Sequence, residues 1–158
     1  MWNGKTVSVI FPAYNEEPNI ARAIGDFKNL KSTDGTPLLD EILVINNNSK
    51  DRTQELAQQA GARVILETKQ GYGNALQRGL QEAKTDLVVL AEPDGTFVPE
   101  DIFKLLSYSG DFEMVCGTRT TQELIWAEAN MGWFLRKGNF VVAKMMEVLY
   151  NTSSISDC

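Results

Sequence analysis

The chain has 158 residues, of which 43% are hydrophobic and 23% charged, so it can bury a core and is neither a disordered nor a fibrous sequence. Fifteen basic residues against 21 acidic ones give a formal charge of −6, and no run of lysine or arginine offsets it, which argues against a nucleic-acid partner. Histidine is absent, so His-based triads, His metal sites and imidazole acid–base catalysis are excluded.

Neither a membrane span nor a secretion signal is visible in the sequence. No apolar stretch approaches the roughly 18 to 20 residues of a spanning helix, and the N-terminus lacks the apolar region of a signal peptide. Cys116 and Cys158 have no framework spacing, which predicts reduced thiols. These features together indicate a cytoplasmic protein.

Apolar, β-rich segments alternate with helical patterns over the first 117 residues. A strand is expected at Thr6–Phe11, ending at Pro12, and further strands at 41–45, 62–66, 87–91 and 113–117. Helices are expected after an N-cap at Asn15, and over about 51–60, 71–83 and 99–107. This alternation predicts an α/β fold, in which a mostly parallel sheet is flanked by helices and joined by right-handed crossovers.

The last 40 residues have a different pattern. Apolar residues repeat at helical spacing from Met131 to Leu149, which predicts an amphipathic helix. Either it packs on the sheet, or it lies on a membrane surface, as Trp126, Trp133 and nearby cations suggest. The sequence stops at Cys158 without a terminating pattern, so we expect 1–158 to be one catalytic domain, truncated at its C-terminal side.

The 87–91 strand runs directly into Glu92-Pro93-Asp94-Gly95. Ligands of open α/β sheets bind at the carboxyl ends of the strands, where these two carboxylates are expected. Two acids on one side of an extended segment repel each other unless a cation lies between them, and a hard divalent ion with oxygen ligands suits that arrangement. On local grounds alone, an ordinary turn at Pro-Asp-Gly is the favoured interpretation of this stretch.

Three further positions have two interpretations each. Gly71-Tyr72-Gly73 precedes a helix and could bring N–H groups to a phosphate, although Leu76 stands where a dinucleotide fingerprint has its third glycine. Close helix packing would explain the same glycines. Arg119 could bind phosphate or be a solvated surface residue, and Asp157 could be a base or a solvated terminal residue.

Four segments in order resemble the family 2 glycosyltransferases of the GT-A (Rossmann-like) fold, most closely the polyprenyl-phosphate type that includes dolichol-phosphate mannose synthase. Val9 to Glu17 looks like the first-strand signature, and Ile45 to Thr53 occupies the place of the Asp-Asp-Gly-Ser-x-Asp-x-Thr signature. Gly71 to Gly79 resembles the glycine-rich segment. Glu92-Pro93-Asp94 stands where the family has its Asp-x-Asp metal motif.

The resemblance implies an inverting hexosyltransferase that takes a sugar from a nucleotide-diphosphate donor of the GDP-mannose or UDP-glucose type. A Mg²⁺ or Mn²⁺ ion would be bound by Asp94, as the primary ligand and a catalytic residue, and by Glu92, directly or through water. Arg119 would bind phosphate, and Asp157 would lie near the acceptor. The implied nucleotide-binding residues are Pro12, Tyr14, Asn15, Glu16, Asn46, Asn47, Gly71, Tyr72 and Gly73.

The implied acceptor is a polyprenyl phosphate at the cytoplasmic face of a membrane, to which the enzyme would bind peripherally. A phosphate monoester is already ionised near neutral pH, so a chain without histidine needs no strong base. Two alternatives stay open: transfer to a saccharide hydroxyl with Asp157 as base, and a non-catalytic sugar-nucleotide-binding module. Asn46, Asn47 and Glu92 depart from the family pattern, which leaves donor identity open.

Overall fold

A computed structural model describes residues 1–117, 138, 141–142, 144–145 and 147–149. The chain divides into two compact units, Met1–Ser107 and Tyr108–Cys158, and each is described by itself. The prediction of a single domain over 1–158 therefore stays a prediction. Arg119 and Asp157 lie outside the described residues.

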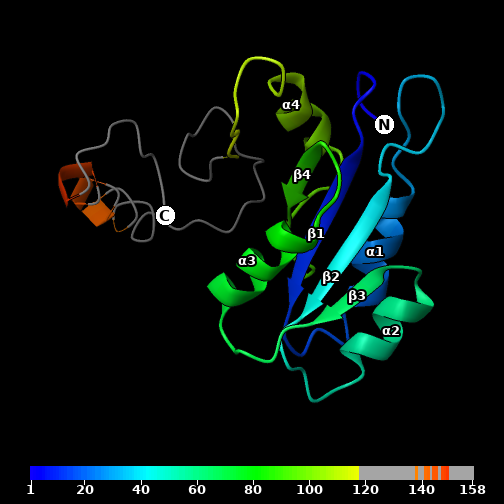
Figure 1. The fold of residues 1–158 in the computed structure, drawn as a ribbon, viewed down its shortest axis with the longest axis vertical. Helices are drawn as coiled ribbons and strands as arrows, with labels where there is room; N and C mark the ends of the chain where they lie inside the picture. The colour runs from blue at the N-terminus through cyan, green and yellow to red at the C-terminus, as the bar shows by residue number, and fades with distance from the viewer. Residues whose placement is uncertain (118–137, 139–140, 143, 146, 150–158) are drawn as a thin grey trace. The chain divides into compact units, whose positions relative to one another are not determined.

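The first unit is a four-stranded parallel sheet with helices on both faces (Figure 1). Its strands lie in the order β3-β2-β1-β4, and every neighbouring pair is parallel. The α/β prediction is thus confirmed. The strands are β1 (Val7–Ala13), β2 (Glu41–Asn46), β3 (Arg63–Leu66) and β4 (Leu87–Leu90), and the helices are α1 (Ile20–Lys28), α2 (Thr53–Gln59), α3 (Tyr72–Glu82) and α4 (Asp101–Ser107).

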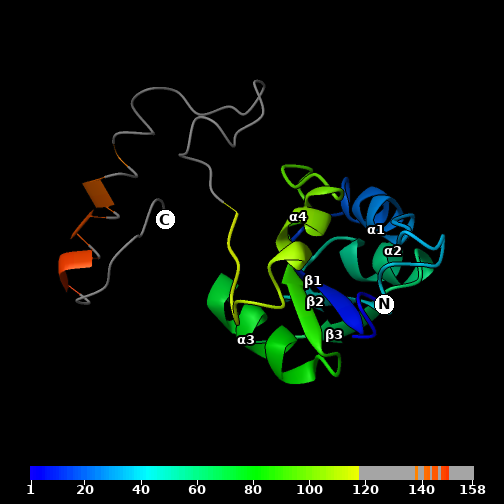
Figure 2. The same ribbon diagram turned by 90° about the horizontal axis from the view of Figure 1, so that it is seen from above.

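Side chains of β1 alternate between two cores, as a pleated strand requires. Val9 and Phe11 belong to the larger core, which includes residues of α1, α2 and α4, and Phe11 meets Phe27 of α1 edge-to-face at 5.0 Å between ring centroids. Ile10 belongs to the smaller core with Ala75 of α3. The view from above shows α3 on one face of the sheet and the other helices on the opposite face (Figure 2). All of β1 is buried because helices cover both faces.

Pro12 does not end the first strand, contrary to expectation, because β1 continues to Ala13. Along a parallel strand, successive residues bond alternately to the two neighbours. Ile10 accepts from Ala91, beyond β4, whereas Ala13 accepts from Asn47, beyond β2. Pro12 faces the β4 side, where pairing has already stopped at Ile10 opposite Leu90, so its missing N–H costs no ladder bond.

Two other local predictions were wrong. Residues 113–117 form no strand, and they are exposed except for a half-buried Val115. Asn15 is not an N-cap: α1 begins at Ile20, with Asn19 at its cap. Asn15 instead has φ 56°, a left-handed conformation that asparagine tolerates in turns.

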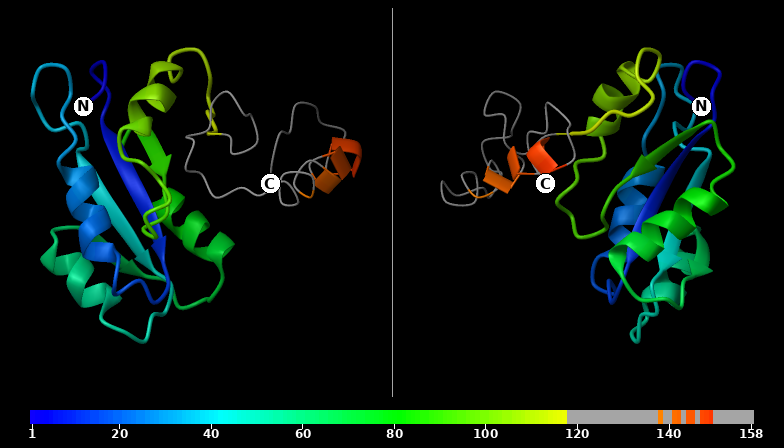
Figure 3. Two further views of the ribbon diagram at one scale, coloured as in Figure 1. Left: turned by 180° about the vertical axis from the view of Figure 1, so that it is seen from behind. Right: turned by 60° about the vertical axis from the view of Figure 1, so that its left-hand side comes forward.

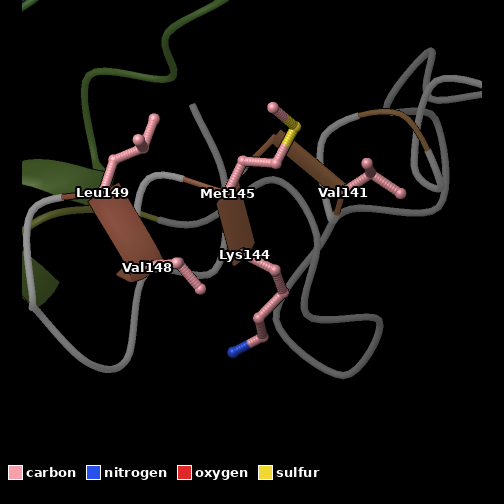
Figure 4. A pocket seen from close by; sticks show the side chains of 5 residues that line it. All are labelled: Val141, Lys144, Met145, Val148 and Leu149. Carbon is pink, nitrogen blue, oxygen red and sulfur yellow. The ribbon is translucent and has the colours of Figure 1, made fainter.

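In the second unit, the described residues between 138 and 149 are all helical, as predicted. Lys144 and four exposed apolar side chains, those of Val141, Met145, Val148 and Leu149, line one open pocket (Figure 4). Lys144 also forms an ion pair with Glu147 at 2.8 Å. Among the described residues, no helix combines the length and apolar character needed to cross a bilayer.

Close approach between α3 and the sheet gives the first testable prediction. A Cβ on Gly79 would lie 2.6 Å from Ile10 Cγ2 and 3.2 Å from Ile45 Cγ1, both in fully buried side chains. We expect Gly79→Ala to lower the free energy of unfolding by about 1 to 3 kcal/mol, because the core must shift to admit the methyl group. Chemical denaturation measures this.

Gly25→Ala in α1 is the matched control, since a Cβ there meets nothing within 4 Å. It should be neutral or stabilising by up to about 1 kcal/mol, because alanine favours the helix. Equal effects at the two glycines would contradict the packing assigned to α3.

Candidate active site

The strand order fixes where a ligand can bind. From β1 the chain proceeds outward through β2 to β3, then returns to place β4 on the other side of β1. The connections after β1 and before β4 therefore leave on opposite faces, and open sheets of this kind bind ligands at this switch point, beyond the carboxyl ends of the strands. The loops 14–19, 47–52, 67–71 and 91–97 follow those ends (Figure 3).

The loop after β1 is tied to the loop after β2 by hydrogen bonds in both directions. Asn15 N–H donates to Ser49 Oγ at 3.0 Å, and Asn15 Oδ1 accepts from Lys50 N–H at 2.9 Å. Glu16 N–H donates to Thr53 Oγ1 at 2.8 Å. These bonds give Asn15 a positioning role that its sequence motif did not reveal. Tyr14 is 46% exposed at the same loop and is available to a ligand.

Asp51 strengthens this tie. Its carboxylate accepts from the N–H groups of Glu17 and Thr53 and from the Thr53 hydroxyl. Burial raises the pKa of Asp51, but the hydrogen bonds from Thr53 and Glu17 outweigh it and leave that pKa below its usual value. The sequence motif alone did not assign a role to Asp51 or Thr53, although Asp-x-Thr is the spacing at which such a local turn forms.

Asn46 and Asn47 are buried, with 3% and 4% of their surface exposed, and both amides are engaged within the chain. Asn46 donates to Gln54 Oε1 and accepts from Ser49 N–H. Asn47 Nδ2 donates to the carbonyls of Glu67 and Lys69 at 3.2 and 2.9 Å. The predicted contact of these residues with the nucleotide stays a prediction.

The glycine-rich loop is held by Asn47 as well. Asn47 Oδ1 accepts from Gly71 N–H at 2.7 Å, and Gly71 has φ 136°, which side chains rarely adopt. Tyr72, the first residue of α3, is 57% exposed, and a Cβ on Gly73 would meet nothing within 4 Å. Open space around the first turn of α3 therefore allows a ligand to approach its backbone.

The acid pair lies beyond the end of β4, which stops at Leu90, so strand alternation does not orient it. Pro93 is buried and Asp94 exposed in a turn, and Glu92 is half-buried. Asp94 Oδ1 accepts from Thr96 N–H at 2.9 Å and from Thr96 Oγ1 at 2.7 Å. These bonds orient the carboxylate, and no described residue bonds to its Oδ2.

The turn and metal interpretations are therefore compatible at this stretch. Two carboxylates, one of them oriented by its own turn, form a hard oxygen donor set suited to Mg²⁺ or Mn²⁺. Among the described residues, no group of three or more His, Cys, Asp or Glu is placed to hold a metal ion. Mg²⁺ commonly completes a site built on two carboxylates with water and substrate phosphate.

Comparison with known proteins identifies related sequences. The family model described as Glycosyl transferase family 2 matches residues 8–152. Protein RfbJ of Shigella flexneri is 33% identical over 123 residues, covering 75% of this chain and 89% of that protein. A dolichyl-phosphate hexose transferase of Haloferax volcanii is 31% identical over 144 residues, covering 90% of this chain and 59% of the relative.

Solved structures agree with the sequence relatives. Glucosyl-3-phosphoglycerate synthase from Mycobacterium tuberculosis, crystallised with Mn²⁺, UDP-glucose and phosphoglyceric acid, is similar with a TM-score of 0.59 and 31% identity. The match covers 67% of this chain and 40% of the synthase. The same synthase has been crystallised with Mg²⁺ and UDP. The chain thus spans less than half of this solved relative.

The buried amide of Asn47 can be tested by Asn47→Asp. The substitution removes the two hydrogen bonds that Asn47 donates and places a carboxylate next to two carbonyl oxygens, which repel it. We therefore expect the free energy of unfolding to fall by about 2 to 4 kcal/mol at pH 7. The loss should shrink at acidic pH, where the introduced carboxyl is protonated and donates once. Asn29→Asp, at an exposed position, should change stability by only about 0.5 kcal/mol; equal losses would contradict the role of Asn47.

The loop tie through Asp51 predicts a pH dependence. A carboxylate with a lowered folded-state pKa stabilises the fold above its unfolded pKa of about 3.9, and this contribution is lost as pH falls through the folded value. Asp51→Asn should therefore cost about 1 kcal/mol at pH 7 and progressively less below about pH 4. Chemical denaturation at a series of pH values measures the cost at pH 7 and its decrease in acid. Asp26→Asn, at an exposed position, is the control. A cost independent of pH would contradict the tie.

Proposed function

Because the chain belongs to glycosyl transferase family 2, we propose that it transfers a sugar from a nucleotide-diphosphate donor to an acceptor, with inversion at the anomeric carbon. The observation that carries the proposal is the oriented Asp94 carboxylate beside Glu92, at the switch-point edge of a sheet similar to one solved with Mn²⁺ and UDP-glucose. A donor of the UDP-glucose or GDP-mannose type fits this proposal.

Asp94 and Glu92 are the residues that would hold the metal ion. When bound, a divalent ion stabilises the negative charge that the leaving nucleotide diphosphate gains as the glycosidic bond breaks. Asp94 is suited to the role because Thr96 already fixes its carboxylate, so little side-chain conformational freedom is lost on binding. Glu92 is longer by one methylene, so it can bind directly or through a water molecule.

The remaining edge loops would hold the donor. Tyr14 and Tyr72 each present an exposed ring, which offers flat apolar surface to a nucleobase. Backbone N–H groups at the start of α3 can meet phosphate, since the first N–H groups of a helix have no partner within it. The ties through Asn15, Asp51 and Asn47 hold these loops in place before the donor arrives, which lowers the entropic cost of binding.

For the acceptor we favour a polyprenyl phosphate. A relative named as a dolichyl-phosphate hexose transferase supports this choice, and so does the chemistry: a phosphate monoester is already ionised near neutral pH and can attack without a strong base. Such an acceptor would bring the enzyme to the cytoplasmic face of a membrane. The exposed apolar side chains of residues 141–149 would suit that surface (Figure 4). Arg119 and Asp157 keep their predicted roles in phosphate and acceptor binding.

Calorimetric titration with UDP and with GDP, each with Mn²⁺ and with EDTA, tests the proposal. We expect one nucleotide to bind more tightly than the other, and its affinity to depend on the metal. A chain that binds no nucleotide, or that binds it with the same affinity in Mn²⁺ and in EDTA, would contradict the proposed chemistry. Metal-dependent binding without transfer by the longer natural protein would instead favour a sugar-nucleotide-binding module.

Asp94→Asn should remove the metal-linked part of nucleotide binding. We expect the Kd measured with Mn²⁺ to rise at least about tenfold, to the value of the unaltered chain in EDTA, because the primary anionic ligand is lost. The melting temperature should change little, since Asp94 is exposed. Glu100→Gln, another exposed acid, is the control. A large loss of stability with binding intact would make this stretch an ordinary structural turn.

A further inference from the structure

Arg22 lies in the first turn of α1, the helix that follows β1 and its edge loop. Its guanidinium reaches across to the turn after β4: a Cβ built on Gly95 would lie 2.8 Å from Arg22 Nη2 and 3.9 Å from Cζ. Gly95 directly follows Asp94 in the chain and has φ 86°. A cation from the β1 side of the crevice thus contacts the turn that carries the acid pair on the β4 side.

The side chain of Arg22 is exposed and forms no ion pair or hydrogen bond with any described residue. Neighbouring Arg52 differs, because it pairs with Glu55 at 3.2 Å and with Glu17 at 4.0 Å. In a chain with six more acidic than basic residues, a guanidinium that lies against the turn next to Asp94 without an ion pair keeps its donors available. Arginine presents five N–H donors in a planar fork that matches phosphate oxygens.

The local charge favours a second cation for an anionic ligand. Glu16, Glu17, Glu92 and Asp94 all lie on the two loops that border the crevice between β1 and β4. A nucleotide diphosphate brings further negative charge, which a divalent ion at Asp94 and Glu92 only partly offsets. A guanidinium next to that ion can hold an oxygen that the metal does not bind, as charge-assisted hydrogen bonds are stronger than neutral ones.

We infer that Arg22 binds the diphosphate of the donor beside the metal ion, as a further donor-binding residue contributed by α1. This inference rests on the proposed function. It also gives a reason for glycine at position 95: any side chain there would displace the guanidinium, in addition to straining the backbone. No feature of the sequence motif indicates Arg22, because the contact joins residues 73 positions apart.

The test compares UDP with uridine, which lacks the phosphates, and GDP with guanosine in parallel. Affinities are measured by titration with Mn²⁺ and with EDTA, for the unaltered chain, Arg22→Gln, Arg22→Lys and the control Lys28→Gln. Lys28 lies in the last turn of the same helix, so its substitution removes the same charge at the far end of α1. Thermal melts report on folding.

We expect Arg22→Gln to weaken nucleoside diphosphate binding about tenfold, both with Mn²⁺ and with EDTA, and to leave nucleoside binding unchanged. Arg22→Lys should retain part of the affinity, and Lys28→Gln all of it. Unchanged diphosphate affinity in Arg22→Gln would overturn the inference while leaving the proposed function intact. Equal weakening of nucleoside and diphosphate would overturn it too, by showing that Arg22 only supports the turn. If the unaltered chain binds no nucleotide, the proposed function fails and this inference with it.

Discussion

The parallel hydrogen bonding of β1 to β2 on one side and to β4 on the other is the constraint on which the rest of the structure depends. With β1 central and covered on both faces, the connection that follows β1 and the connection that leads into β4 run over opposite faces of the sheet. A crevice at its carboxyl end follows from this topology. The loop that begins at Tyr14 and the turn that ends at Thr96 border it, so residues far apart in sequence meet there.

Polar ties within the chain keep this edge ordered. Asn47 holds the loop before α3 through both the nitrogen and the oxygen of its side-chain amide, and Asp51 holds the loop after β1. Each tie is a hydrogen bond of modest net value, about 0.5 to 1.5 kcal/mol, but a buried amide left without partners costs more than the bond contributes. Loops fixed in this way can present Tyr14 and the start of α3 to a ligand without first becoming ordered, while Thr96 orients Asp94 in its own turn. Preorganisation of this kind lowers the entropic cost of holding substrates in a reactive arrangement.

Much of the fold was predictable, because β2, β3 and β4 are short apolar runs bounded by turn residues, and the structure agrees with their expected ranges to within one residue. The failures have physical causes. Residues 113–117 have strand composition but are mostly exposed and form no strand, and Pro12 is tolerated inside β1 only because of where the β4 pairing stops. Neither outcome can be predicted from composition, because strand formation at 113–117 and the tolerance of Pro12 both depend on tertiary contacts.

The candidate site was predictable where it resembles ordered family motifs, and not where it depends on contacts across the fold. Glu92 and Asp94 follow β4, as expected. That Asn47 binds the glycine-rich loop, and that Arg22 rests on Gly95, could not be inferred from spacing. Asparagines in place of family acids left donor identity open, and the structure adds that Asn47 holds backbone groups of the loop before α3, whereas Asn46 bonds to Gln54 and Ser49.

A crystal structure of the chain with UDP and Mn²⁺ tests the central claim most directly. The claim is that a metal ion bound by Asp94, with Glu92, anchors a nucleotide diphosphate at the carboxyl edge between β1 and β4. Anomalous scattering locates manganese without reference to the protein atoms. The predicted result is one manganese peak in contact with the Asp94 carboxylate and with diphosphate oxygens. Nucleotide bound at this edge with no manganese at Asp94, or manganese bound elsewhere, would contradict it.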